Sequence, residues 1–509
     1  MATSEVIAGG KRRKSSRLPI ILRRCVSFPV LLGTALVLGN FAIESSLRID
    51  PDTWMHIKLG EGILETGRWP TGDVYSFTAS GVFRMAFEWV GEVVMALAWR
   101  WGGSRGMEAL LILLTSAIVL LVYYYAYLRC SSSKAAFLAT VLALPLAALE
   151  FTLRPQLLGY AFLLIMLIFL ERFRKGQQGT LWALPPLFLI WVNAHGSFAL
   201  GVFVLGLYWV SGLFGFTLGG LEGRPWADHQ RRHIAWIFLL CLVALTVTPY
   251  GTRLAAYPID MAFSQPVGVA SVQEWQSMPF NLLQGKLFIV LVLGFVVAHV
   301  ALKLAWRLEE MILFLFAFYS SCLHCRFIIF FAIISAPLVG SLVARWIPRY
   351  DSSVDKYALN IALIGVAFVI TIKYFPTQAE LDKKVAESYP VKAVEYLRRH
   401  PVPRPMFNDY GFGGYLLWSM GPEQKVFIDG RADLYEYAGA FTDYNDIMAL
   451  KPTTDFLLRK YAVQSCLIQR NAPLATLLAA LPGWKEIYTD DVSVLLARNP
   501  QPSASGSAK

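Results

Sequence analysis

IDPDTWMHIKLGEGILETGRWPTGDVYSFTASG, residues 49–81, is a polar stretch that directly follows the first hydrophobic segment of the chain. Most of the sequence from there to about residue 375 is apolar. Charged groups beside a bilayer are costly unless they are solvated or used. We therefore interpret this stretch as the candidate active-site loop, whose acidic and histidine side chains are Asp50, Asp52, His56, Glu61, Glu65 and Asp73.

The composition predicts a polytopic α-helical membrane protein. Of the 509 residues, 56% are hydrophobic and only 16% are charged, whereas soluble domains carry roughly 25% charged residues. The net charge is +11, but the basic residues lie mainly in short loops beside hydrophobic segments. They indicate control of topology rather than binding of nucleic acid. The six cysteines are scattered and suggest no disulfide framework.

A helix needs about 20 apolar residues to cross the hydrocarbon core, which predicts about eleven spans in this chain. They lie near residues 26–44, 108–128, 135–150, 157–171, 180–194, 197–216, 233–249, 285–303, 309–323, 327–345 and 357–375. The segment 86–101 is amphipathic, and we expect it to lie at the membrane interface rather than to span.

The distribution of basic residues predicts the orientation. Residues 1–25 are basic and precede the first span without a convincing cleavage site, which indicates a cytoplasmic N-terminus. The first loop, residues 45–107, follows a single span and therefore lies outside the cytoplasm. An odd number of spans also places the region after the transmembrane domain (26–375) outside. The expected location is the inner, or plasma, membrane.

Residues 376–499 change character and alternate between strand-like and helix-like runs. The expected strands lie at 405–408, 425–429, 465–469 and 492–496. This alternation predicts a small extracytoplasmic α/β domain, followed by a disordered tail at 500–509.

In the first loop, Asp50 and Pro51 predict the start of a helix that runs from about Asp52 to Glu65. Asp52 and His56 are four residues apart and share a face of that helix. A carboxylate beside a histidine can act as a general base or, together with Asp50, ligate a divalent cation. The alternative is that the aspartates only cap the helix. We keep Asp52 and His56 as catalytic candidates.

Two further acidic residues are candidates in the same loop. Asp73 follows a turn at Pro70 and Gly72, and is either a second catalytic residue or a group that satisfies the turn backbone. Glu88 lies where the loop returns to the membrane, and is either a substrate-binding residue or the polar edge of an interfacial helix.

Polar residues between later spans fall on the same outer side. Arg154 either binds a phosphate through bidentate hydrogen bonds or extends to lipid headgroups. Asn193 and His195 interrupt an apolar run, where irregular backbone is tolerated only if it is buried or lines a cavity. The candidate substrate-binding residues are therefore Glu88, Arg154, Asn193, His195, Glu274 and Arg326.

Two motifs stand out in the C-terminal region. Residues 407–415, FNDYGFGGY, are similar to a phosphate-binding glycine turn but lack the GxGxxG spacing. Residues 428–435, IDGRADLY, suit either sugar binding or the packing of a loop.

The first loop resembles that of the GT-C class of membrane glycosyltransferases, which includes protein mannosyltransferases and arabinosyltransferases. The residues that carry the resemblance are Asp52-Thr-Trp-Met-His56, Gly60, Ile63, Gly67, Pro70, Asp73, Ser76-Phe-Thr78, Gly81 and Glu88-Trp89. Residues 153–156, 193–196 and 428–435 are similar to the same uncharacterised bacterial branch.

The resemblance implies a many-helix fold, an acidic base in the first loop, a polyprenyl-phosphate sugar donor and transfer with inversion. The chain has Asp-Thr-Trp where better-known members have two adjacent acidic residues, so the base is either Asp52 or Asp50. The resemblance does not decide whether the activity depends on a divalent metal ion. The expected partners are membrane lipid, the donor, and a glycan or protein acceptor, with no nucleic acid. The alternatives are a transporter of a polar lipid and a non-catalytic envelope-assembly protein.

Overall fold

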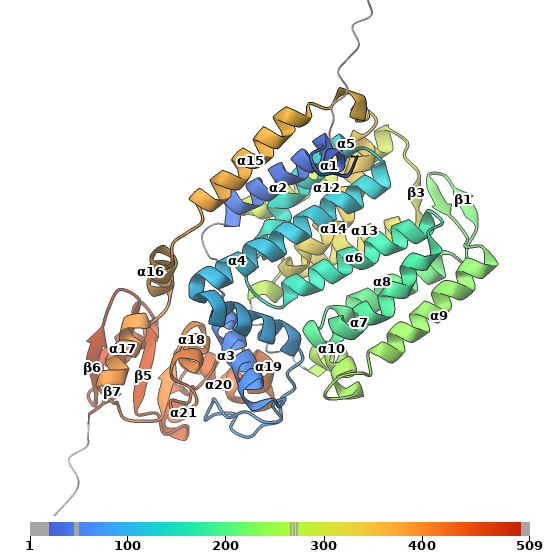
Figure 1. Ribbon diagram of the computed structural model, residues 1–509. Coiled ribbons are helices and arrows are strands. Elements are labelled where there is room, and N and C mark those ends of the chain that lie inside the picture. The colour runs from blue at the N-terminus through green and yellow to red at the C-terminus, as the bar shows by residue number, and fades with distance from the viewer. Residues whose placement is uncertain (1–19, 45–49, 265–266, 268–269, 271–272, 500–509) are drawn as a thin grey trace, which may run out of the picture.

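A computed structural model describes residues 20–44, 50–264, 267, 270 and 273–499. Most of the basic N-terminus and the expected disordered tail lie outside the described residues. Figure 1 shows a bundle of helices, with the C-terminal helices and strands gathered below one end of it.

Every predicted span coincides with a helix of the bundle. These helices are α2 (Phe28–Glu44), α4 (Trp89–Cys130), α5 (Ser133–Ala147), α6 (Gln156–Arg174), α7 (Leu184–Ala194), α8 (Phe198–Ser211), α9 (Asp228–Ala244), α12 (Leu283–Ala301), α13 (Leu308–Leu323), α14 (Ile328–Val343) and α15 (Tyr357–Lys373). Shorter helices are α1 (Ile20–Cys25), α10 (Thr252–Ser264) and α16 (Gln378–Ser388). Helix α14 is buried along most of its length and packs against α4, α5 and α13.

Among the described residues, six helices are long and apolar enough to cross a membrane, and a seventh crossing results if the bent pair α15 and α16 counts as one. The chain is therefore a membrane protein. The number of eleven spans stays a prediction, because helices α7, α8, α9 and α13 are shorter than this criterion requires.

Helix α4 contains both the expected interfacial segment and the second predicted span. A break at Gly103, with φ 52° and ψ −138°, separates the two parts. A positive φ is easily adopted only by glycine. The part before the break packs along α3, and the part after it joins the bundle.

Helix α3 (Pro51–Thr66) confirms the helix expected in the first loop. The Asp50 side chain caps it by accepting a hydrogen bond from the backbone N–H of Asp52, and Gly67 ends it with φ 63°. Gly60 lets α3 approach α4 closely, since a Cβ there would lie 2.1 Å from the carbonyl oxygen of Glu92.

An aromatic cluster anchors α3 to the C-terminal region. Trp54 is buried, and its ring contacts those of Trp99, Tyr389, Tyr415 and Trp418. Helix α3 thus lies between the helical bundle and the C-terminal elements, as Figure 1 shows.

The C-terminal region contains a four-stranded mixed sheet in the order β4-β5-β7-β6. The strands are β4 (Met406–Asn408), β5 (Ser465–Gln469), β6 (Trp484–Thr489) and β7 (Ser493–Arg498). β4 and β5 are parallel, with Phe407 opposite Cys466, and β7 runs antiparallel to both β5 and β6. The helices are α17 (Val391–Arg399), α18 (Tyr410–Met420), α19 (Ala432–Tyr437), α20 (Ala440–Met448), α21 (Thr454–Lys460) and α22 (Pro473–Ala480).

The prediction of a strand at 425–429 is wrong. These residues do not enter the sheet; Val426 forms an isolated parallel bridge with Ser76 of the first loop. The backbone N–H of Val426 donates to Tyr75 O, and that of Phe77 donates to Val426 O. The backbone N–H and C=O groups of Val426 need hydrogen-bond partners, and the first loop, which is distant in the sequence, provides them.

Buried and partly buried ion pairs lie at the opposite end of the bundle, near a small sheet of β1 (Phe216–Leu218), β2 (Leu221–Gly223) and β3 (Trp306–Arg307). Arg307 lies 2.8 Å from Glu171, and Arg129 lies 2.6 Å from Glu310. Part of the positive charge on this side is therefore neutralised by glutamates.

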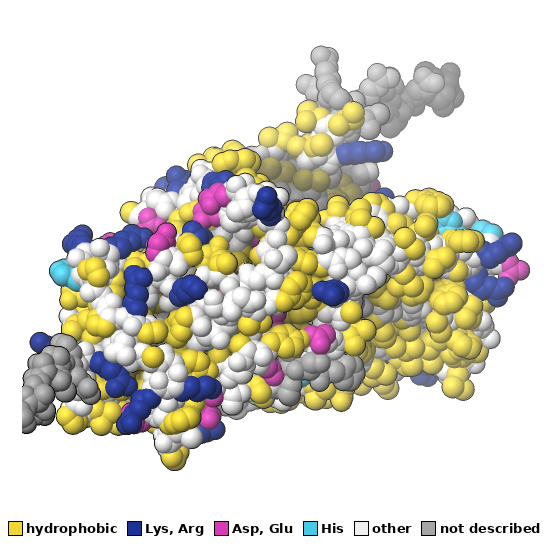
Figure 2. Space-filling model, turned by 90° about the horizontal axis from the view of Figure 1, so that it is seen from below, with side chains coloured by type: hydrophobic (Ala, Val, Ile, Leu, Met, Phe, Trp, Pro, Cys, Tyr) yellow, Lys and Arg dark blue, Asp and Glu magenta, His cyan; other side chains and the backbone are white. Residues whose placement is uncertain are grey.

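Figure 2 shows the molecule from below the view of Figure 1, the side on which the C-terminal elements lie. Most Lys and Arg side chains in this view gather on the half toward those elements, whereas the other half is largely hydrophobic. Such a division suits a molecule with one part in water and one in lipid.

Candidate active site

A cavity of about 480 Å³ lies where α3, the starts of α4 and α6, the α7–α8 turn, α10 and the C-terminal region meet. Seven predicted site residues line it, namely Asp52, His56, Glu88, Arg154, His195, Glu274 and Arg326. These residues come from segments spread over most of the chain. Asp50, Asp73 and Asn193 are not among the lining residues.

Arg154 faces the N-terminus of α3. Its Nη2 lies 3.1 Å from Asp52 Oδ2, its Nη1 lies 3.7 Å from Asp50 Oδ2, and it also forms an ion pair with Glu274. The Thr53 hydroxyl donates to Leu153 O at 2.8 Å, which ties α3 to the turn that carries Arg154. The structure thus gives Arg154 a carboxylate cluster as partner.

Burial raises the pKa of Asp52 to about 7, although the charge of Arg154 opposes the increase. The Asp50 carboxylate adds to the increase. A carboxylate with a pKa near neutrality is a stronger base than an ordinary aspartate and is still ionised in part at pH 7.

His56 lies between two glutamates on the other side of the cavity. Its Nε2 is 3.7 Å from Glu88 Oε2, and its Nδ1 is 3.5 Å from Glu92 Oε1. Burial works against the charged imidazole, but Glu92 and Glu88 raise the pKa of His56 above its usual value. Arg84 Nη2 lies 3.6 Å from the same Glu92 oxygen. This arrangement favours a protonated His56, which is a cation rather than a base.

His195 has the opposite character. Its Nδ1 accepts a hydrogen bond from the Ser197 backbone at 3.0 Å, and its Nε2 lies 3.4 Å from Glu88 Oε1. Burial, with help from Arg326 and Arg154, lowers the pKa of His195 to about 3. The imidazole is therefore neutral, with its proton on Nε2, and can donate a hydrogen bond toward the cavity.

Glu274 connects Arg154 with a second arginine. Its Oε2 lies 3.8 Å from Arg326 Nη1, and the guanidinium of Arg326 lies 4.4 Å from the centre of the Trp275 ring. Burial alone would raise the pKa of Glu274, but the two arginines lower it below the usual value. The carboxylate is therefore charged.

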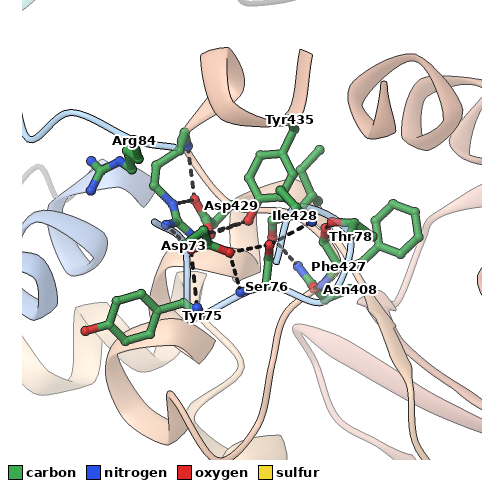
Figure 3. Close-up of polar contacts among 12 residues, drawn as sticks. Asp73, Tyr75, Ser76, Thr78, Arg84, Asn408, Phe427, Ile428, Asp429 and Tyr435 are labelled. Atoms are coloured by element: carbon green, nitrogen blue, oxygen red, sulfur yellow. Dashed lines mark hydrogen bonds and ion pairs between the residues drawn. The ribbon is translucent and has the colours of Figure 1, made fainter. Parts of the chain in front are cut away.

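Asp73 belongs to a separate buried cluster (Figure 3). It accepts hydrogen bonds from the Ser76 backbone at 2.8 Å and from the Ser76 hydroxyl at 2.6 Å. It also pairs with Arg431, which binds Asp429 at 2.5 Å. Tyr435 donates to Asp429 in the same cluster. These contacts join the first loop to the C-terminal region and support the turn interpretation of Asp73.

Asn193 also has structural partners. Its Oδ1 accepts a hydrogen bond from Trp89 Nε1 at 2.8 Å, and its Nδ2 donates to Leu189 O and Val247 O. These bonds hold the end of α7 against the start of α4, so Asn193 supports the turn that carries His195.

The C-terminal region closes the cavity over Asp52. Its lining residues are Tyr410, Gly430, Arg431, Ala432 and Asp433. A Cβ at position 430 would lie 1.8 Å from Asp52 Oδ1, so any larger residue there would displace the Asp52 carboxylate. Sequence reasoning missed Gly430, along with Arg84 and Glu92, because their importance arises from contacts with distant segments.

The glycines of residues 407–415 pack helices together. Helix α18 begins there, capped by Asp409, which accepts from the Gly411 backbone at 2.9 Å. A Cβ at Gly414 would lie 2.3 Å from Pro51 O, and one at Gly413 would lie 2.0 Å from Ile428 O. The similarity to a phosphate-binding turn is therefore explained by close packing against α3.

The residues considered for a metal do not fit one. In the described part of the chain, no group of three or more His, Cys, Asp or Glu side chains is arranged to hold a metal ion. Asp50 and Asp52 instead face the guanidinium of Arg154, and His56 faces two glutamates. No step proposed below passes through a metal.

No family model and no curated protein matches the sequence. Solved structures do match. The archaeal oligosaccharyltransferase AglB from Archaeoglobus fulgidus, in complex with an inhibitory peptide and a dolichol-phosphate, is 12% identical with a TM-score of 0.50, over 86% of this chain and 69% of that one. The chain has the fold of a GT-C membrane glycosyltransferase.

Two further solved structures are similar to this chain. The same archaeal enzyme tethered to an acceptor peptide is 11% identical with a TM-score of 0.50, over 92% of this chain and 74% of that one. ArnT from Cupriavidus metallidurans bound to undecaprenyl phosphate is 15% identical with a TM-score of 0.49, over 93% and 99% of the two chains. The resemblance drawn from the first loop is thus confirmed for the fold.

Proposed function

We propose that this protein is a membrane glycosyltransferase that moves a sugar from a polyprenyl-phosphate donor to an extracytoplasmic glycan or protein acceptor, with inversion. The observation that carries the proposal is the Asp52–Arg154 pair, a carboxylate and a guanidinium 3.1 Å apart in one cavity. A base for the acceptor and a cation for the leaving phosphate are what this reaction requires.

Asp52 acts as the general base. As the acceptor hydroxyl oxygen attacks the anomeric carbon, its proton passes to the Asp52 carboxylate. The bond from that carbon to the phosphate oxygen breaks on the opposite face, and its electron pair leaves with the phosphate. General-base catalysis contributes about 10²–10⁴-fold in rate. The pKa of Asp52, about 7, supports this role.

Arg154 and Arg326 bind the leaving phosphate. Guanidinium groups hold phosphate oxygens through paired hydrogen bonds, and negative charge grows on these oxygens as the bond breaks. Neutral His195 adds a hydrogen-bond donor. A phosphodiester-linked sugar carries a single negative charge, and it competes for the two arginines with the carboxylates that pair with them.

The apolar part of the cavity lining suits the lipid chain of the donor. Apolar side chains of α6, α8 and α14 line it, namely Leu163, Ala199, Leu200, Ile329 and Phe330. The dolichol-phosphate in the AglB complex is consistent with a lipid-linked donor in this fold. The proposed orientation has the N-terminus in the cytoplasm, and the cavity and residues 376–499 outside the plasma membrane.

The test compares wild type with Asp52→Asn in sugar transfer from a radiolabelled polyprenyl-phosphate sugar pool. We expect the turnover of Asp52→Asn to fall by about 10²–10⁴-fold, while binding of polyprenyl phosphate persists. Glu61→Gln, on the same helix but outside the cavity lining, serves as the control with wild-type turnover.

Equal turnover in Asp52→Asn and wild type would show that Asp52 is not the base. A wild-type protein that consumes no donor but moves the lipid across vesicles would instead be a transporter.

A further inference from the structure

Arg154 is surrounded by more negative charge than it can neutralise. Asp50, Asp52 and Glu274 all lie within ion-pair distance of its guanidinium. Like charges at such distances repel strongly where water is scarce. A phosphate that entered this cluster would add a further negative charge.

Of the three carboxylates, Glu274 alone also contacts the second arginine. Asp50 and Asp52 belong to the capped N-terminus of α3, where Asp50 holds the backbone of Asp52 at 2.9 Å. Glu274 lies in η3 (Gln273–Trp275) and spans the gap between Arg154 and Arg326. Its Oε2 is buried without a hydrogen-bond partner, so that oxygen is held by charge alone.

We infer that the Glu274 carboxylate occupies the place of the donor phosphate and that the phosphate must displace it to bind. Carboxylate and phosphate oxygens use the same N–H groups of a guanidinium, and the two arginines cannot serve both anions at once. This inference rests on the proposed function and adds a selectivity device to the same site.

Displacement of Glu274 distinguishes a phosphate that carries a polyprenyl chain from one that does not. A small anion, such as inorganic phosphate, has only its charge with which to compete against a carboxylate already in place. A phosphate on a polyprenyl chain also buries apolar surface, which contributes about 25 cal/mol per Å², against the apolar wall of the cavity. Glu274 therefore admits lipid-linked phosphates and excludes soluble ones.

The experiment measures binding of undecaprenyl phosphate and of inorganic phosphate to the purified full-length protein in nanodiscs. Glu274→Gln keeps the shape of the side chain and removes its charge. We expect the Kd for undecaprenyl phosphate to fall about tenfold in Glu274→Gln, and inorganic phosphate to become a measurable competitor. Glu274→Ala provides a second variant with the same expected direction, and Glu61→Gln is the charge-matched control with the wild-type Kd.

An unchanged or increased Kd in Glu274→Gln and Glu274→Ala would overturn the inference and leave the proposed function intact. Absence of binding in wild type and in both variants would overturn the inference together with the proposed donor. Tighter binding without any sugar transfer would support displacement of Glu274 and contradict the glycosyltransferase.

Discussion

At the level of single residues, two aspartates at one helix end have different environments. The Asp50 side chain accepts a hydrogen bond from the backbone N–H of Asp52, so it is engaged as the cap of α3. The carboxylate of Asp52 caps nothing and faces Arg154 at 3.1 Å in the cavity. The sequence leaves Asp50 and Asp52 as alternative bases, and this difference in contacts is why we propose Asp52.

The pH dependence of transfer tests this assignment. Asp52 must be ionised to accept a proton, and its raised pKa keeps it protonated below about pH 7. The rate should therefore fall as the pH drops through about 7. Asp50→Asn can still cap the helix but removes a like charge that raises the pKa of Asp52. In Asp50→Asn we therefore expect the acid limb, the fall in rate at low pH, to shift to lower pH.

The measurement is kcat/KM between about pH 5 and pH 9, which reports the pKa of groups in the free enzyme. Glu61→Gln should keep the wild-type profile. An acid limb that stays in place in Asp50→Asn, or moves to higher pH, would contradict the assignment of this limb to Asp52.

At the level of elements, the position of α3 depends on contacts from both sides. Gly60 brings it against α4, and Gly414 and Gly430 bring the C-terminal region against it. The first loop shares backbone hydrogen bonds with Val426. The buried Asp73–Arg431–Asp429 cluster, whose two aspartates are labelled in Figure 3, joins the loop to the same region. The C-terminal region is thus a structural wall of the candidate site.

Replacement of Arg431 tests this connection. Arg431→Met leaves the buried carboxylates of Asp73 and Asp429 without their cation. Breaking a buried ion pair from one side costs about 3–5 kcal/mol. We expect a lower thermal unfolding midpoint in detergent and earlier proteolysis of the C-terminal region.

Arg459→Met is the matched control, because Arg459 and Asp455 form an exposed pair on α21. Such pairs contribute about 0–1 kcal/mol. Equal unfolding midpoints for the two variants would mean that the buried cluster does not hold the loop in place.

At the level of the whole molecule, the site and the paired charges near β1–β3 occupy opposite ends of the bundle (Figure 1). The proposed orientation places the site end outside the cytoplasm. The lipid-linked donor would then enter the cavity from the membrane, and the acceptor from the aqueous side.

Cysteine labelling tests the orientation. Cys25 is exposed near the start of α2, and Lys451 is exposed in the C-terminal region. In chains with a single cysteine, a membrane-impermeant maleimide should label Lys451→Cys in intact spheroplasts and should label Cys25 only after permeabilisation. The reverse pattern would contradict the orientation, and labelling of both in intact cells would contradict the odd number of spans.

The sequence by itself determined that the apolar segments and the first-loop segment form helices, and placed them approximately. α3 runs from Pro51 to Thr66 with Asp50 as its N-cap, within a residue or so of the predicted Asp52–Glu65, because capping and helical hydrogen bonds involve residues only a few positions apart. The apolar segments became helices for the same reason, since a backbone in lipid must satisfy its hydrogen bonds locally.

Only the tertiary structure decided which polar groups meet. Asp73 pairs with Arg431, 358 residues away, and Gly430 makes room for Asp52. The predicted strand at 425–429 does not form, and Val426 pairs with Ser76 of the first loop instead of with the sheet. Ion pairs and close backbone contacts join residues that are distant in the chain, so no local pattern specifies them. The role of Asp52 therefore depends on neighbours that folding alone brings to it.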